Sequence, residues 1–135
     1  MPTEQEILGF TNRWHADALA TAEPVTLPSG ARIRAVRPAY LVATKIEAYR
    51  GRGNGDMLRS IDFEDIVRLV DGREELGAEI AQAPPELRAF IIEALTELSE
   101  QPLFETALGG ALLPDAASQA RLSLVLQRIE QIRTP

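Results

Sequence analysis

The feature that most constrains this fold is a series of apolar residues at helical spacing, which runs from Pro38 to the end of the 135-residue sequence. Residues three or four apart share one face of a helix, so each group predicts a helix with one buried side. The groups are Leu41, Val42, Ile46 and Tyr49; Phe63, Ile66, Val67 and Val70; Leu76 and Ile80; Leu87, Phe90, Ile91, Leu95 and Leu98; and Leu122, Val125, Leu126, Ile129 and Ile132. Glycine or proline separates the groups, so we expect about five helices.

Some ends of these helices are also marked. Pro38 and Pro84-Pro85 suit the first turns of helices. Gly72 stands where a helix is expected to close, and Asp115 stands where the N-cap of a long last helix is expected.

Two short runs of alternating apolar and polar residues precede the first of these helices. Ser29-Gly30 lies between the runs, and such a dipeptide permits the tight turn of a β-hairpin. An isolated hairpin is marginal in water, so we expect the strands to pack on a helix or on further strands. The sequence therefore predicts an α+β fold that is predominantly α, with one short N-terminal β-hairpin followed by a bundle of about five helices. We expect one domain over 1–135, with an arm and hairpin over 1–37 and the helical bundle over 38–135.

Composition excludes several kinds of site. The sequence has no cysteine and a single histidine, His15. Disulfides, a zinc site with cysteine ligands and a cysteine nucleophile are excluded, and a histidine-rich metal site is not expected. The N-terminus is acidic and polar, without the features of a signal peptide, and no apolar run reaches the length of a membrane span. We therefore expect a cytoplasmic protein that does not enter a membrane.

Charge is unevenly distributed along the chain. The formal net charge is -6, which argues against general nucleic-acid binding across the whole surface. Between Arg32 and Arg59, however, seven cationic residues outnumber two anionic ones. That segment carries +5 and the remainder of the chain -11, so one face is expected to attract phosphate.

The segment after the predicted hairpin holds the residues most suited to chemistry. Lys45 lies within the first predicted helix, Arg50 and Arg52 lie in a glycine-rich turn after it, and Asp62 and Asp65 lie at the start of the next helix. A lysine ammonium can contact a triphosphate or neutralise a leaving pyrophosphate. Two carboxylates three residues apart share a helix face and can orient a lysine or a substrate. The arginines and the backbone N–H groups of the turn can wrap phosphates.

In order and spacing these motifs resemble those of the AbiEii-type nucleotidyltransferase-like proteins, a class that includes bacterial abortive-infection and toxin–antitoxin toxins. Members carry a Leu-Ala-x-Lys-like helix, an arginine-rich turn and a D-x-x-D helix. The resemblance covers roughly residues 7–73, and the C-terminal helices match only by pattern. It implies catalytic roles for Lys45, Asp62 and Asp65, and nucleotide or phosphate binding for Arg50 and Arg52. It also implies a cognate antitoxin or another protein as partner.

The metal-binding motifs of that class are missing from this sequence. In such enzymes a G-S motif opens a helix, a D-x-D strand holds Mg²⁺ against the nucleoside triphosphate, and two metals clamp the attacking and leaving oxygens. Neither motif occurs here, and Ser29-Gly30 has the reverse order. We therefore assign no metal ligand, and expect Mg²⁺ and NTP only if a complete site is supplied. From the resemblance we therefore expect either that the chain begins late or that it is a remnant that has lost the metal-binding half.

Each candidate residue also has a structural explanation. Lys45 can be an exposed helix residue. Asp62 can be an N-cap with Asp65 as the acid at the third helical position, a device worth about 1 kcal/mol. Arginines and glycines at a helix end are also an ordinary termination. The sequence leaves both explanations open.

Two functions therefore compete. The first is a nucleotidyltransferase-like protein that lacks the metal-binding half, is inactive alone, and transfers NMP from NTP only if that half is supplied. The second is a non-enzymatic helical module for protein interaction or dimerisation. Missing strands would leave a hairpin edge and apolar helix faces uncovered, so we also expect a homodimer.

Overall fold

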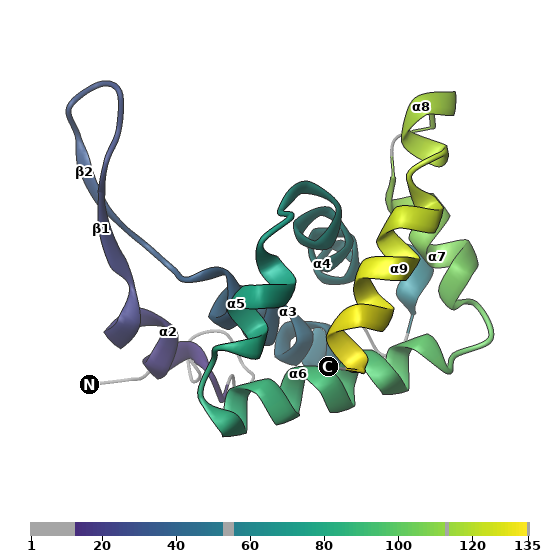
Figure 1. Ribbon diagram of the computed structural model, residues 1–135, viewed down its shortest axis with the longest axis horizontal. Helices are drawn as coiled ribbons and strands as arrows, with labels where there is room; N and C mark the ends of the chain where they lie inside the picture. The colour runs from purple at the N-terminus through teal and green to yellow at the C-terminus, as the bar shows by residue number, and fades with distance from the viewer. Residues whose placement is uncertain (1–12, 53–55, 113, 135) are drawn as a thin grey trace.

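The computed structural model describes residues 13–52, 56–112 and 114–134. The elements are helix α2 (His15–Thr21), strands β1 (Glu23–Thr26) and β2 (Arg32–Ala35), helix α3 (Pro38–Arg52), the 3-10 helix η1 (Met57–Arg59), and helices α4 (Ile61–Gly72), α5 (Leu76–Ala81), α6 (Pro85–Ser99), α7 (Phe104–Ala111), α8 (Ala116–Gln119) and α9 (Leu122–Arg133) (Figure 1). The predicted class, a hairpin followed by helices, is confirmed. Seven α-helices rather than about five follow the hairpin in the described residues.

The hairpin forms where the sequence predicts it. β1 and β2 are antiparallel, with Val25 opposite Ile33, and Gly30 in the turn has a φ of 88°, which glycine tolerates best. The expectation that the strands pack on a helix or on further strands is wrong for the described residues. Every residue of β1 is exposed, and in β2 only Ala35 is half-buried. The hairpin projects from the helices instead (Figure 1).

Two arginines fix the base of the hairpin to α2. Nη2 of Arg34 donates a hydrogen bond to the carbonyl oxygen of Ala22 at 2.8 Å, and Nε of Arg37 donates to that of Thr21 at 3.0 Å. Arg37 also forms an ion pair with Glu23, with 3.0 Å between Nη2 and Oε1. Because these partners lie at the end of α2 and the start of β1, the arginines set the direction in which the hairpin leaves the helices.

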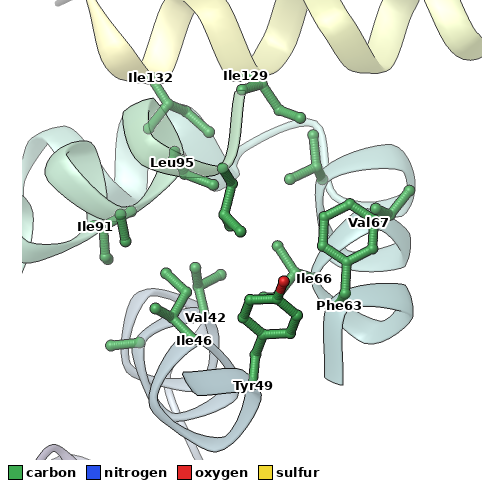
Figure 2. Packing of buried hydrophobic residues seen from close by; sticks show 14 of the residues in the cluster. Val42, Ile46, Tyr49, Phe63, Ile66, Val67, Ile91, Leu95, Ile129 and Ile132 are labelled. Carbon is green, nitrogen blue, oxygen red and sulfur yellow. The ribbon is translucent and has the colours of Figure 1, made fainter. Parts of the chain in front are cut away.

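The core lies between α3, α4, α6 and α9, whose apolar faces are those that the sequence predicts. Figure 2 shows side chains from all four helices meeting in one cluster: Val42 and Ile46 from α3, Phe63, Ile66 and Val67 from α4, Ile91 and Leu95 from α6, and Ile129 and Ile132 from α9. Each such side chain stabilises the fold by about 1.5–3 kcal/mol through burial. Trp14, just before α2, joins this cluster, because its ring centroid lies 5.2 Å from that of Phe90.

The ends of the helices agree with the sequence in part. Gly72 is the last residue of α4 and Pro85 is the first of α6, as predicted. Asp115 is an N-cap, since its carboxylate accepts a hydrogen bond from the backbone N–H of Ser118 at 3.1 Å. It caps only the four-residue α8, however, and α9 begins separately at Leu122. The predicted long last helix is therefore divided in two.

Arginines of the C-terminal region hold the end of α4. Nη1 of Arg128 donates hydrogen bonds to the carbonyl oxygens of Val70 at 3.0 Å and Asp71 at 2.7 Å. Nε of Arg121 donates to Oδ1 of Asp71 at 2.6 Å. The last carbonyl groups of a helix have no partner within the helix and attract cations, so these bonds cap α4 and dock α9 beside it.

Replacing Ile91 by alanine is expected to lower the free energy of unfolding by about 2–5 kcal/mol, because the change removes buried area and leaves a cavity. Ile91 is 0% exposed, whereas Ile61 is 73% exposed. Ile61→Ala is therefore the matched control, with an expected change below about 0.5 kcal/mol. Urea denaturation measures both free energies. An equal loss of unfolding free energy in Ile91→Ala and Ile61→Ala would contradict the burial of Ile91 in the core.

Candidate functional site

Three of the predicted site residues meet between α3 and α4. The Nζ atom of Lys45 lies 2.8 Å from Oδ2 of Asp65 and 3.9 Å from Oδ1 of Asp62. The shorter distance is that of a charge-assisted hydrogen bond, whereas the longer one is that of an ion pair without a direct hydrogen bond. We call Lys45, Asp62 and Asp65 the lysine–aspartate cluster.

The start of α4 places the two carboxylates. Ser60 is the N-cap of α4, and its hydroxyl accepts a hydrogen bond from the backbone N–H of Phe63 at 3.1 Å. Asp62 therefore lies within the first turn, and its interpretation as the N-cap is wrong. Asp62 and Asp65 are three residues apart in α4, so they share the face that meets Lys45. The positive end of the helix dipole also favours carboxylates in the first turn.

The cluster extends from the protein interior to solvent. The side chain of Asp62 is 9% exposed, and those of Asp65 and Lys45 are 32% and 30% exposed. Among the described residues, Asp62 is the one buried charged residue. A buried carboxylate is costly unless a cation or hydrogen-bond donors compensate it. Lys45 is thus half-buried rather than an exposed helix residue, and its ammonium lies between the buried Asp62 and solvent.

Lys45 is also the only lysine in the sequence, because the other 13 of the 14 lysine and arginine residues are arginines. A guanidinium suits a bidentate pair with one carboxylate, whereas an ammonium is a compact charge with three donors for separate acceptors. The contact with Asp65 uses one of these donors. The remaining N–H groups are therefore available to an anion that approaches from solvent.

Of the two candidate phosphate-binding arginines, Arg50 does not join this cluster. Nη2 of Arg50 pairs with Oε2 of Glu97 on α6 at 2.9 Å, and its guanidinium carbon lies 5.2 Å from the ring centroid of Phe90. Arg50 therefore links α3 to α6, whereas Lys45 faces α4. Arg52 is the last residue of α3, and its side chain lies outside the described structure, so its role stays a prediction.

Tyr49 is a neighbour of the cluster that the sequence did not single out as functional. It lies one turn after Lys45 on the same face of α3, and its ring centroid is 6.3 Å from that of Phe63. Burial, and secondarily the charge of Asp56, raise the pKa of the Tyr49 hydroxyl. The phenol therefore stays protonated at neutral pH. The sequence signal that could have identified Tyr49 is its spacing of four residues from Lys45, which places the two residues on one helix face.

Neither a metal site nor a membrane span is found in the described structure. Its residues contain no group of three or more histidine, cysteine, aspartate or glutamate side chains that could hold a metal ion. In the same residues no helix combines the length and the apolar character needed to cross a bilayer.

Comparison with protein-family models, curated proteins and solved structures finds no match to this chain. The resemblance to AbiEii-type proteins therefore stays a hypothesis that depends on the motifs. The geometry independently shows that Lys45, Asp62 and Asp65 lie together.

A double-mutant cycle of Lys45→Met and Asp65→Asn is expected to give a coupling free energy of about 1 kcal/mol or less, because solvent screens a pair that is about one-third exposed. The matched control is the more exposed pair Arg68 and Glu64, also on α4, with an expected coupling of about 0.3–0.5 kcal/mol. Urea denaturation of the single and double variants measures both. A Lys45–Asp65 coupling above about 3 kcal/mol would instead identify a structural pair of the buried kind.

Proposed function

We propose that this chain is a nucleotidyltransferase-like protein whose lysine–aspartate cluster contacts the triphosphate of a nucleotide. The observation that carries the proposal is the position of the sole lysine. Lys45 is held between two carboxylates of α4, yet its side chain remains 30% exposed. The ammonium thus offsets the charge of the buried Asp62 on one side and remains accessible to a solvent anion on the other.

Each member of the cluster has a separate role in this proposal. Lys45 donates hydrogen bonds to a phosphate oxygen from its solvent-facing side. Asp62, which is buried, fixes the position of the ammonium from within the protein. Asp65, which is partly exposed, holds the ammonium where the cluster meets solvent. When nucleotide binds, a phosphate oxygen replaces part of the contact between Asp65 and the ammonium. We do not extend phosphate binding to Arg50, because Glu97 and Phe90 engage its guanidinium.

The chain is proposed to bind nucleotide without transferring it. The cluster carries two negative charges and one positive charge, so a bare triphosphate is repelled by the aspartates. Mg²⁺ supplies charge neutralisation for a nucleoside triphosphate when it is bound. We expect transfer of NMP only if a complete metal site is supplied, because the G-S and D-x-D motifs of the class that the chain resembles are missing from the sequence. A nucleotide-dependent role fits the cytoplasm, the location that we propose.

Titration calorimetry with Mg²⁺·ATP tests this proposal. Lys45→Ala is expected to weaken binding by roughly ten- to hundredfold, as the loss of a charge-assisted hydrogen bond predicts. Lys45→Arg is not expected to restore affinity, because a guanidinium is wider and pairs with one carboxylate in a fixed plane. Arg68→Ala is the matched control: it removes one positive charge from α4, outside the cluster, and should change affinity by less than about twofold.

Equal binding by the Lys45→Ala and Arg68→Ala variants would contradict the proposal, since the effect would then follow net charge alone. Absence of binding at millimolar nucleotide would also contradict it. The melting temperature of each variant serves as the folding control. A large loss of stability in Lys45→Ala alone would identify Lys45 as structural.

One observation favours the second candidate function, a non-enzymatic interaction or dimerisation module. Val25 and Ile33 lie opposite each other in the hairpin and are 40% and 45% exposed. Leu27, two residues after Val25 and 38% exposed, continues the same face. An apolar face on a projecting hairpin is suited to a partner. We propose a second copy of the chain, with the two faces packed about a twofold axis; a cognate antitoxin is the other occupant that the family resemblance suggests.

Light scattering after size-exclusion chromatography tests the homodimer. The chain is expected to form dimers as its concentration is raised, and Ile33→Thr is expected to weaken the dimer by about tenfold or more, since it replaces an apolar contact by a hydroxyl. Leu103→Thr is the control, because Leu103 is 53% exposed and lies outside the hairpin. A monomer at every concentration, or an equal effect of the two substitutions, would contradict the homodimer.

A further inference from the structure

A pocket of about 290 Å³ lies at the base of the hairpin, apart from the residues of the lysine–aspartate cluster. Its walls come from β1, the first turn of α3, the segment after α4, and the connection between α5 and α6. The volume is near the lower end of the range for small-molecule sites. Neither Lys45 nor its two aspartates line it.

The pocket combines apolar and polar lining. The accessible apolar surface comes from Pro38, Ala83 and Pro84, which are half-buried or exposed, whereas Ala39 and Leu87 lie behind it and are buried. These side chains provide contacts for the apolar body of a ligand. Polar groups form more than half of the accessible lining, so the pocket suits a ligand that carries a charged group beside an apolar part.

Two guanidinium–carboxylate pairs supply the charged groups. Nε and Nη2 of Arg73 bind the two carboxylate oxygens of Glu79 at 2.6 and 3.0 Å. Nη2 of Arg37 lies 3.0 Å from Oε1 of Glu23, and its Nε donates to a backbone carbonyl. All four of these side chains line the pocket.

The arginines retain unused hydrogen-bond donors. A guanidinium has five N–H groups in a fixed fork, and the bonds just described use Nε and Nη2 of each arginine and leave Nη1. Tyr40 and Gln82 also line the pocket and carry a hydroxyl and an amide that can donate. Each glutamate, by contrast, already receives a guanidinium. The glutamates also keep some accepting capacity, but each has its charge offset by a guanidinium, whereas the free N–H groups of the arginines can pair with a further carboxylate as Arg73 does with Glu79.

We propose that this pocket binds a small organic carboxylate with an apolar body. The carboxylate accepts hydrogen bonds from Arg73 and Arg37, and the body lies against the apolar surface of Ala83 and Pro84. The proposal is independent of the nucleotide proposed for Lys45, because no residue is shared between the two sites.

The probe is indole-3-acetate, with binding to the full chain followed by saturation-transfer NMR and calorimetry. A ligand of this size is expected to bind with a Kd of about 1 mM or below. Tryptamine and indole-3-ethanol keep the apolar body but lack the carboxylate, so both are expected to bind at least about tenfold more weakly. Inorganic phosphate has charge without an apolar body and is also expected to bind more weakly.

Two substitutions are expected to act in opposite directions. Arg73→Ala removes a donor and is expected to weaken binding by about tenfold or more. Glu79→Gln releases the guanidinium of Arg73 and removes a competing negative charge, so it is expected to strengthen binding several-fold. Arg68→Ala, a change on α4 outside the pocket, is the matched control and leaves binding unchanged. If Arg73→Ala fails to fold, the expected gain in affinity of Glu79→Gln still tests the site.

Weaker binding to Glu79→Gln would overturn the proposal, because it would mean that a cationic ligand group uses Glu79. Equal binding of indole-3-acetate and indole-3-ethanol would overturn the need for a carboxylate, and phosphate binding of equal strength would overturn the need for an apolar body. No binding of indole-3-acetate to either the unmodified chain or Glu79→Gln at several millimolar would overturn the site altogether.

Discussion

The packing of α3 against α4 is the interaction on which the rest of this structure depends. Its apolar part, which includes Ile46 and Phe63, lies in the common core. Its polar part is the contact of Lys45 with Asp62 and Asp65. Because apolar burial holds the two helices together, the ammonium and the carboxylates meet without having to supply the energy of association. A half-buried ion pair of modest strength can therefore be held in one geometry and left open to solvent.

Much of the fold follows from the sequence, because apolar periodicity reports which side of a helix is buried. The apolar face of α6 around Ile91 and Leu95 lies in the core as expected. The periodicity does not report where a regular helix is interrupted. Asp115 has the chemistry of an N-cap and uses it, but the sequence signal is local and cannot tell a four-residue helix from a long one. The exposed position of the hairpin is likewise a tertiary property, set at its base by Arg34 and Arg37.

The sequence likewise predicts part of the candidate site but not all of it. Spacing along one helix shows that Asp62 and Asp65 share a face, and the motif order suggests that Lys45 opposes them. Spacing does not reveal which helix covers each face, so the pairing of Arg50 with Glu97 was not predicted. Nor did it show that Ser60 rather than Asp62 caps α4, since both residue types serve as N-caps and only the backbone path decides between them.

The proposed function requires the ammonium of the lysine–aspartate cluster to face the phosphates of a nucleoside triphosphate. A direct measurement is possible because the sequence has a single lysine: growth with ¹³C,¹⁵N-lysine labels Lys45 alone and leaves its charge and its three N–H donors unchanged. The proposal predicts that the Lys45 side-chain signal shifts on titration with Mg²⁺·ATP and stays in place with adenosine. An unchanged lysine signal at saturating nucleotide, or an equal shift with adenosine, would contradict it.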